Sequence, residues 1–92
     1  MLSKEEQTRL GASLLGISYV DAQKYSIEIG DGDAIYLSIP TKGGGSLIVG
    51  ADGQALYAVS AVGFDKHLEE YNKGRRTPLE SFKKYTEEIT NS

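Results

Sequence analysis

The sequence predicts an α+β fold in which a four-stranded antiparallel meander is covered by an N-terminal helix and two C-terminal helices. Three observations lead to this prediction. Short runs with strand periodicity occupy the middle of the chain, an Asp52-Gly53 pair separates two apolar, β-prone runs, and apolar residues recur at helical spacing on either side of this region. A chain of 92 residues has room for one hydrophobic core, so we expect a single domain over residues 1–92.

The first predicted element is a helix that begins after Ser3 and runs to about Leu15. Ser3 and Glu6 have the spacing of a capping box, in which the Ser side chain accepts the amide of the residue three positions later and the Glu reaches back. Gly16 is a typical C-terminal stop for such a helix. The apolar side of the helix consists of Leu10, Leu14 and Ile17.

Two strands follow. Residues 25–29 alternate apolar and polar side chains with a period of two, which is typical of a half-buried strand. Residues 30–33 have the composition of a turn, and residues 34–39 form the second predicted strand. Pro40 ends this strand because a proline has no N–H group for the ladder. Ile35, Leu37 and Ile39 share one face of this strand, and if that face meets the helices, Tyr36 faces outward.

The strongest local signal is the hairpin predicted over residues 46–59. Its two apolar runs flank Asp52-Gly53, a pair that is frequent in tight hairpin turns. A glycine-containing loop at residues 41–45 leads into the first of these strands. Hairpin-linked strands in this order form a meander with one face that needs a cover.

Two helices are predicted after the hairpin. Phe64, Leu68 and Tyr71 form one apolar stripe, and Gly74 is placed to close that helix in a left-handed conformation. A last helix begins at Thr77-Pro78-Leu79-Glu80, where Thr can cap and Pro suits the first helical position. Its stripe consists of Leu79, Phe82, Tyr85 or Thr86, and Ile89. The expected order is α-β-β-β-β-α-α in two layers.

Composition excludes several classes of protein. The chain has no cysteine, so it has neither thiol catalysis nor thiolate metal sites, and a reducing compartment is favoured. The N-terminal segment is charged and lacks the apolar core of a signal peptide, and no run approaches the ~20 apolar residues of a membrane span. We therefore expect a cytoplasmic protein without membrane contact. The net charge of −3 disfavours generic binding to nucleic acid.

No catalytic or metal-binding pattern emerges. His67 is the only histidine, and general acid–base catalysis needs a partner and a pocket that spacing alone does not supply. Asp31 and Asp33 resemble the start of a calcium loop, but the sixth and twelfth positions from Asp31 are Tyr36 and Lys42 instead of Gly and Glu. The glycines of residues 43–45 lead into a strand, unlike those of a phosphate-binding loop. We expect no cofactor, no metal and no enzymatic activity.

The candidate partner-binding residues fall into two charged groups and one aromatic residue. The acidic group could steer a basic partner, although a solvated turn is the more common explanation of such a group. Tyr36 should point away from the helices, as an exposed aromatic anchor of the kind that dominates interfaces. The arginines of the basic segment could hold a carboxylate or phosphate, or simply meet the dipole of a helix C-terminus. These candidates are Glu28, Asp31, Asp33, Tyr36, Arg75 and Arg76.

The C-terminal half of the predicted fold has a recognisable order: a glycine-containing lead-in, an apolar strand, an Asp/Gly turn, a second strand, and a helix that ends in Glu-Tyr. The segments concerned are Gly44-Gly45-Ser46-Leu47-Ile48-Val49, Asp52-Gly53, Ala55-Leu56-Tyr57 and Leu68-Glu69-Glu70-Tyr71, with Ala34-Ile35-Tyr36-Leu37 as an earlier aromatic strand. In this order the chain resembles the YrhB-like small immunity proteins of bacterial polymorphic toxin systems. The resemblance covers about half of the chain and implies stoichiometric inhibition of a cognate toxin without catalysis.

The leading functional hypothesis is a non-enzymatic protein-binding module, an immunity protein that inhibits a bacterial toxin domain by occluding its active site. Acidic side chains would steer the encounter if that domain is basic. Two alternatives stay open: a small-ligand or peptide sensor in which the loop at residues 43–45 closes over a pocket, and an accessory subunit of an enzyme. An exposed edge strand could pair with the target or with a second copy, so the oligomeric state is open as well.

Overall fold

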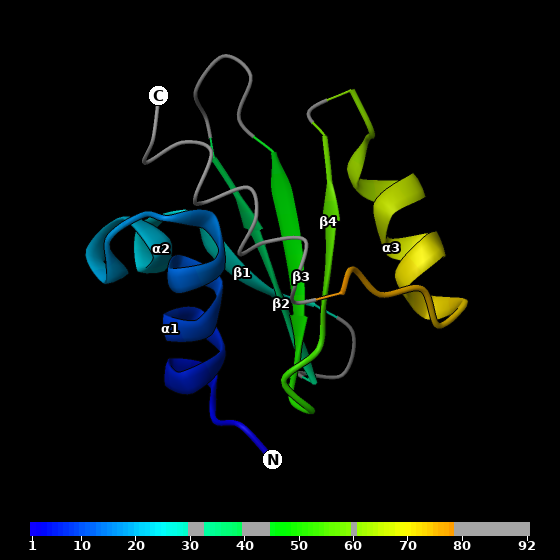
Figure 1. Ribbon diagram of the computed structural model, residues 1–92. Coiled ribbons are helices and arrows are strands. Elements are labelled where there is room, and N and C mark those ends of the chain that lie inside the picture. The colour runs from blue at the N-terminus through cyan, green and yellow to red at the C-terminus, as the bar shows by residue number, and fades with distance from the viewer. Residues whose placement is uncertain (30–32, 40–44, 60, 79–92) are drawn as a thin grey trace.

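Four antiparallel strands in the order β1-β2-β3-β4 form the centre of the structure (Figure 1). The computed structural model describes residues 1–29, 33–39, 45–59 and 61–78. The meander and the α+β class are as predicted. The elements in chain order are α1 (Lys4–Leu15), α2 (Tyr19–Lys24), β1 (Ser26–Ile29), β2 (Ala34–Ser38), β3 (Ser46–Gly50), β4 (Ala55–Ala58) and α3 (Phe64–Asn72).

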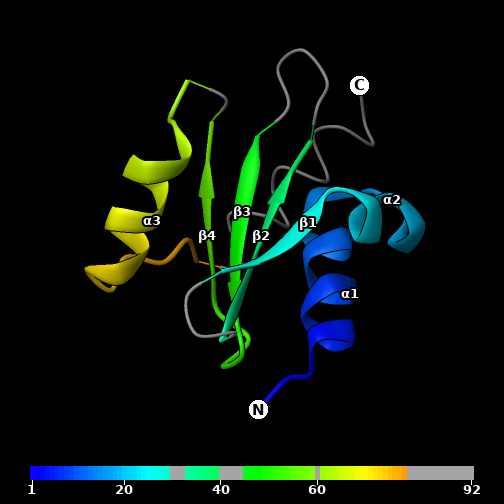
Figure 2. The same ribbon diagram turned by 180° about the vertical axis from the view of Figure 1, so that it is seen from behind.

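Helices cover both faces of the sheet, so the expected two-layer arrangement is wrong. Helices α1 and α2 lie on one face and α3 on the other, in both views of Figures 1 and 2. Every residue of β3 is buried, because successive side chains point to opposite faces and each face has its own cover. The unbroken apolar run Leu47-Ile48-Val49 is typical of a strand enclosed on both faces. This run indicates a helix layer on each face of the sheet, whereas the alternating pattern of β1 indicates a layer on one face alone.

The two faces carry separate apolar clusters. The larger cluster lies between the sheet and α1 with α2, where Ala12 and Ala22 meet the strands. Helix α1 approaches closely because Gly11 has no side chain: a Cβ there would lie 3.0 Å from a Leu37 methyl group. The smaller cluster lies under α3 and is built around Ile29, Ala34 and Ile48. The strand residues of the larger cluster are Ile35, Leu37, Leu47, Val49 and Ala55.

The ends of α1 are as predicted. Ser3 Oγ accepts the Glu6 amide at 3.1 Å, and the Glu6 carboxylate accepts the Ser3 amide at 2.9 Å. Gly16 ends the helix with a φ of 70°. The buried face differs from the predicted apolar side, because close approach to the sheet selects small or polar residues. That face consists of Gln7, Thr8, Gly11 and Ala12, while Leu10, Leu14 and Ile17 pack around it.

Gln7 is the polar residue that connects α1 to the sheet. Its side chain is almost wholly buried, and its Nε2 donates to two backbone carbonyls, Asp33 O and Val49 O, both at 3.0 Å. Both protons of one amide are therefore used to hold β2, β3 and α1 together. A buried amide with satisfied donors fixes position more specifically than an apolar contact does.

Helix α2 was not expected. Ser18 begins it by accepting the amide of Asp21 at 3.1 Å, and the Arg9 guanidinium of α1 lies 4.1 Å from the centre of the Tyr19 ring. A helix of six residues has too few turns to show an amphipathic period. The Ser18-to-Asp21 spacing was its one local signal, since Ser is a frequent N-cap. Strand β1 consequently begins at Ser26, one residue later than expected.

The hairpin is confirmed. Strands β3 and β4 pair in a register that places Leu47 opposite Tyr57 and Val49 opposite Ala55. Asp52 Oδ1 accepts the Gln54 amide at 3.0 Å, and Gly53 takes a φ of 83°. The Asp side chain and the Gly conformation are the two features that make this pair suited to a tight turn.

Helix α3 is anchored by a buried histidine. His67 is 1% exposed, and its Nε2 lies 2.8 Å from Leu56 O while its Nδ1 lies 3.1 Å from Ser46 Oγ. A carbonyl only accepts, so Nε2 carries the proton and the Ser46 hydroxyl donates to Nδ1. Burial lowers the pKa of His67 from its ordinary value, against the opposing effect of the Leu56 carbonyl. The ring is neutral and ties α3 to β3 and β4.

The chain after α3 returns to the sheet. Thr77 N–H donates to Ala55 O at 2.8 Å, and Thr77 Oγ1 accepts the Tyr57 amide at 2.9 Å. Both contacts fall on the outer edge of β4. The predicted final helix lies beyond Pro78, outside the described residues, as do most of the predicted turn at residues 30–33, most of the loop at residues 41–45, and Pro40.

Replacing Gln7 tests the link between α1 and the sheet. The Gln7→Leu variant keeps side-chain bulk but leaves Asp33 O and Val49 O without their amide donor, and we expect a loss of about 1–3 kcal/mol in the free energy of unfolding. Urea denaturation measures this loss. The matched control is Gln23→Leu on the exposed side of α2, which should change stability by no more than about 0.5 kcal/mol. Equal effects of the two substitutions would contradict the assignment.

Acidification tests the state of His67. The pKa of the folded chain is lowered by burial, whereas the unfolded chain titrates near about 6.5. The stability that His67 contributes is therefore complete above about pH 6.5 and declines as the pH falls below it, by up to ~1.4 kcal/mol for each unit between the two pKa values. Urea denaturation between pH 7.5 and about pH 5 measures the slope. His67→Gln, which does not titrate, should flatten it, and parallel curves for both proteins would refute the interpretation.

Candidate functional site

The outer edge of β1 is the first candidate surface. Strand β1 pairs with β2 alone, so within the described ranges no segment occupies its other side. Ser38 N–H donates to Tyr25 O, which sets the alternation of the ladder: Ile27 and Ile29 direct their backbone groups to β2, and Ser26 and Glu28 direct theirs outward. We call Ile27, Glu28, Tyr36 and Phe64 the β1-edge surface.

The apolar part of the β1-edge surface lies on the α3 side. Ile27 is 56% exposed and stands opposite Tyr36 in the register, so their side chains are neighbours on one face. The Tyr36 ring meets the Phe64 ring edge-on, with centroids 4.7 Å apart. Phe64 is itself partly exposed. An exposed aliphatic residue and two rings thus form a continuous apolar strip.

Tyr36 does not have the expected environment. The sequence predicted an exposed ring on an uncovered face, but α3 packs over that face and leaves Tyr36 half-buried. Its ring also lies 5.7 Å from the His67 ring, centroid to centroid. The error follows from assuming one layer of helices, because a residue that points away from α1 then appears to point to solvent. Only the margin of the ring is available to a partner.

The acidic candidates are dispersed around this edge. Glu28 stands opposite Ile35 in the register, so it points to the α1 side while Ile27 points to the α3 side. Asp33 has an exposed side chain, and its carbonyl is fixed by Gln7 and by the Ala51 amide at 2.9 Å. Asp31 lies outside the described residues. The structure therefore brings Glu28 and Tyr36 to one edge but on opposite faces.

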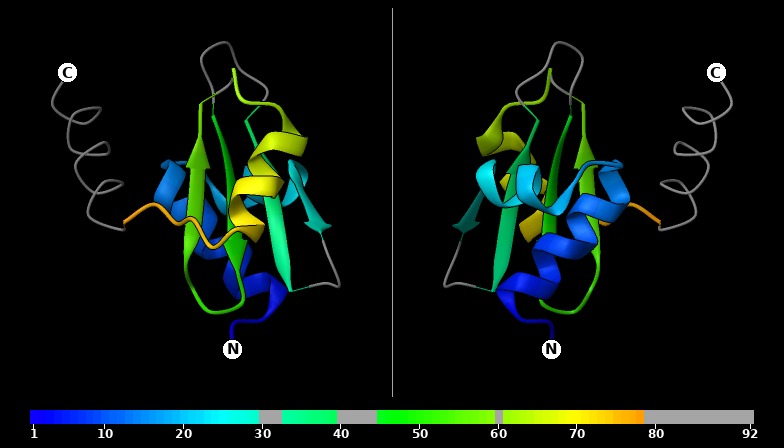
Figure 3. Two further views of the ribbon diagram at one scale, coloured as in Figure 1. Left: turned by 90° about the vertical axis from the view of Figure 1, so that its right-hand side faces the viewer. Right: turned by 90° about the vertical axis from the view of Figure 1, so that its left-hand side faces the viewer.

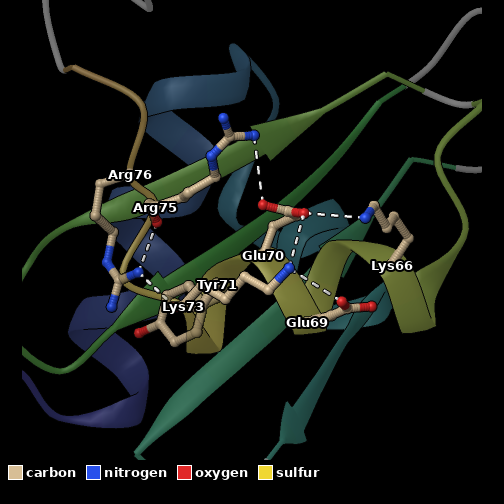
Figure 4. Close-up of polar contacts among 7 residues, drawn as sticks. All are labelled: Lys66, Glu69, Glu70, Tyr71, Lys73, Arg75 and Arg76. Carbon is tan, nitrogen blue, oxygen red and sulfur yellow. Dashed lines mark hydrogen bonds and ion pairs between the residues drawn. The ribbon is translucent and has the colours of Figure 1, made fainter.

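Charged residues converge on Glu70 at the other side of α3 (Figure 4). Lys66 Nζ lies 3.0 Å and Lys73 Nζ 3.8 Å from one carboxylate oxygen, and Arg75 lies 3.4 Å from the other. Lys73 also contacts Glu69 at 3.1 Å. Lys66 holds the pKa of Glu70 below its ordinary value, and Glu70 raises that of Lys66 in turn.

The two candidate arginines diverge. The chain leaves α3 through Gly74, whose φ is 96°, and the amides of Gly74 and Arg75 return to Tyr71 O and Glu70 O, as in a Schellman motif. This turn directs Arg75 to Glu70. Arg76 lies instead over the Tyr71 ring, 3.7 Å from its centre, and donates to Tyr71 O at 2.9 Å. The two arginines therefore do not converge on a single anion, although their adjacency in the sequence had allowed that arrangement.

Tyr71 is affected both by Arg76 and by the acidic residues Asp33 and Asp52. Burial raises the pKa of its hydroxyl, opposed by Arg76 and reinforced by Asp52 and Asp33. Gly50 makes room for the hydroxyl, because a Cβ at that position would collide with it. Tyr71 is thus a packed structural residue whose ring serves as the platform for Arg76.

A cleft of about 340 Å³ lies between β4 and α3. Sequence reasoning missed it, because its residues come from β4, the loop that follows it, α3 and the segment after α3, and only the fold brings them around one space. The Lys66-to-Glu70 pair, at helical i, i+4 spacing, was its only local signal. The cleft is lined by Leu56, Tyr57, Ala58, Val59, Val62, Lys66, His67, Glu70 and Arg75.

The geometry gives no support to catalysis by His67. Its contact with Ser46 joins a hydroxyl to an imidazole, but both residues are buried, and the ring proton is already given to Leu56 O. A nucleophile must reach its substrate, and Ser46 lies inside the sheet between two strands. Among the described residues, no group of three or more His, Cys, Asp or Glu side chains is placed to hold a metal ion.

The described helices include none that is long and apolar enough to cross a membrane. No protein-family model matches the chain, and neither a curated protein nor a solved structure is significantly similar to it. Two surfaces of the described structure are candidates for binding, the β1-edge surface and the cleft between β4 and α3.

Proposed function

We propose that this chain is a non-enzymatic protein-binding module that receives its partner at the β1-edge surface. The observation that carries the proposal is the difference between the two edges of the sheet. Thr77 occupies outward backbone groups of β4, whereas the outward groups of Ser26 and Glu28 meet no described segment. An uncovered edge strand is a template for another strand, and natural folds commonly cover such edges.

The mode of binding would be strand addition. An extended segment of the partner would pair with Ser26 and Glu28 through main-chain hydrogen bonds, and its apolar side chains would contact Ile27 and the margins of Tyr36 and Phe64. Main-chain bonds supply affinity in this mode, and the side-chain contacts supply specificity. The half-buried position of Tyr36 suits this role, since its ring is held in place by Phe64 before the partner arrives.

The partner would be a bacterial toxin domain, and the chain its immunity protein. The resemblance of the hairpin and following helix to YrhB-like immunity proteins motivates this choice, and Glu28 with Asp33 would favour a basic target. An interface of ordinary size buries roughly 800 Å² on each partner, enough to cover an active-site cleft. Inhibition would then follow from occlusion alone, in a cytoplasm shared with the toxin.

Substitution of Ile27 tests the surface directly. A tagged chain is used to capture a stoichiometric partner from its own cells, and the partner is identified and purified for affinity measurement. Ile27→Lys should weaken the affinity at least about tenfold, because Lys on an edge strand opposes pairing and the apolar contact is lost. Val20→Lys, at another exposed apolar position, should bind as the unmodified chain does. Equal affinities for the two variants would exclude the β1-edge surface.

Charge reversal of Glu28 tests steering. Glu28→Lys should slow association with a basic toxin domain by about threefold to tenfold at low salt, and the difference should shrink at high salt because exposed charges are screened. Stopped-flow mixing measures the rate. Glu5→Lys on α1 makes the same change in net charge at an exposed site away from the edge strand. If it slows association equally, net charge rather than this surface is responsible.

A further inference from the structure

The cleft between β4 and α3 has the size and lining of a small-molecule site and lies at the opposite edge of the sheet from the β1-edge surface. Its volume of about 340 Å³ is within the range of ligand pockets. In Figure 3 (left), α3 crosses in front of the middle of the sheet, and β4 forms the edge of the sheet beside it. Nothing in the proposed protein-binding function uses this cleft.

Apolar side chains form the walls. Leu56 comes from β4 itself, and Val59 and Val62 from the segment that connects β4 to α3. Val59 is more than half exposed, although a valine next to an apolar wall would ordinarily be covered. A ligand that enters the cleft would remove these three side chains from water, at about 25 cal/mol for each Å² of apolar surface.

The buried ring of His67 lines the cleft but offers no hydrogen-bonding group to a ligand. Its Nε2 proton is given to Leu56 O, and its Nδ1 accepts from Ser46. The ring is neutral, because burial lowers its pKa. A polar or charged group placed against this ring would lose its water without compensation. The part of a ligand that reaches the ring must therefore be apolar.

Two cations stand at the rim. The side chains of Lys66 and Arg75 are 60% and 72% exposed, while Glu70 between them is only 18% exposed. Glu70 contacts both cations through its two carboxylate oxygens, and its single negative charge balances one of their two positive charges. Among the described groups, one terminal nitrogen of Arg75 contacts a protein carboxylate, and both cations keep further donors that no described carboxylate occupies. Figure 4 shows these two side chains approaching Glu70 from opposite sides.

We propose that the cleft binds a small monocarboxylate with an apolar body. The carboxylate lies between Lys66 and Arg75, where it supplies the second negative charge that this pair of cations lacks. The apolar body lies against Leu56, Val59 and Val62. Arg suits such a site because its planar guanidinium presents parallel donors to a carboxylate. A dicarboxylate fits less well, because its second charge would lie against the apolar walls.

Octanoate is the probe for the experiment. It is titrated into isotope-labelled full-length chain, and the backbone amide resonances of the cleft residues are followed by NMR. Saturable shifts should appear with an affinity at least about fivefold higher than for octanamide, which keeps the apolar body and lacks the charge, and higher than for butyrate, which keeps the charge and shortens the body. Absence of saturable shifts up to about 10 mM octanoate, or equal affinity for octanamide, would overturn the proposal.

Three variants separate this site from general attraction by a basic surface. Lys66→Gln and Arg75→Gln should each weaken octanoate binding about fivefold. Lys73→Gln is the matched control, because Lys73 contacts the same Glu70 carboxylate but does not line the cleft. It should leave the affinity within about twofold, and an equal loss in all three variants would overturn the proposal. Thermal unfolding confirms that each variant is folded. Failure of this site would leave the β1-edge tests unaffected, since they concern other residues.

Discussion

Strand β3 is enclosed on every side, and the arrangement of the other elements follows from this constraint. It has a paired strand on each flank and a helix layer on each face, so all five of its residues are buried. Leu47 and Val49 need α1, and Ile48 needs α3. Neither helix layer can be absent without exposing part of an apolar strand to water. The meander is therefore the middle layer of three.

Polar contacts decide where each helix layer sits. The two layers use one buried polar residue each: Gln7 donates to carbonyls at the ends of β2 and β3, and His67 bridges β3 and β4. Apolar packing alone would allow either helix to slide along the sheet with little change in free energy. A directional bond to a particular carbonyl removes that freedom. His67 also lines the cleft beside α3, so the contact that joins the helix to β4 lies next to that cleft.

Local signals in the sequence were reliable, and most of the errors concern how separate elements pack against one another. The capping box at Ser3, the Asp52-Gly53 turn and the left-handed Gly74 depend on a few consecutive residues, and the structure has each of them. Whether Tyr36 faces solvent depends instead on where α3 packs, some 30 residues later in the chain. Helix α2 is too short for periodicity to reveal it. The cleft residues come from β4, the loop after it, α3 and the segment after α3, and no spacing rule connects Val59 to Arg75.

The covering of β4 by Thr77 limits how this sheet can grow. A sheet with two open edges can add copies of itself without end, and that is the geometry of a fibre. Here Thr77 occupies Ala55 O and Tyr57 N–H, so in the part of the chain that the structure describes, the β1 side is the edge left without a neighbour. Two copies that met through β1 would form one continuous eight-stranded sheet about a twofold axis, with a Thr77 segment at each end. Such an assembly would stop at the dimer.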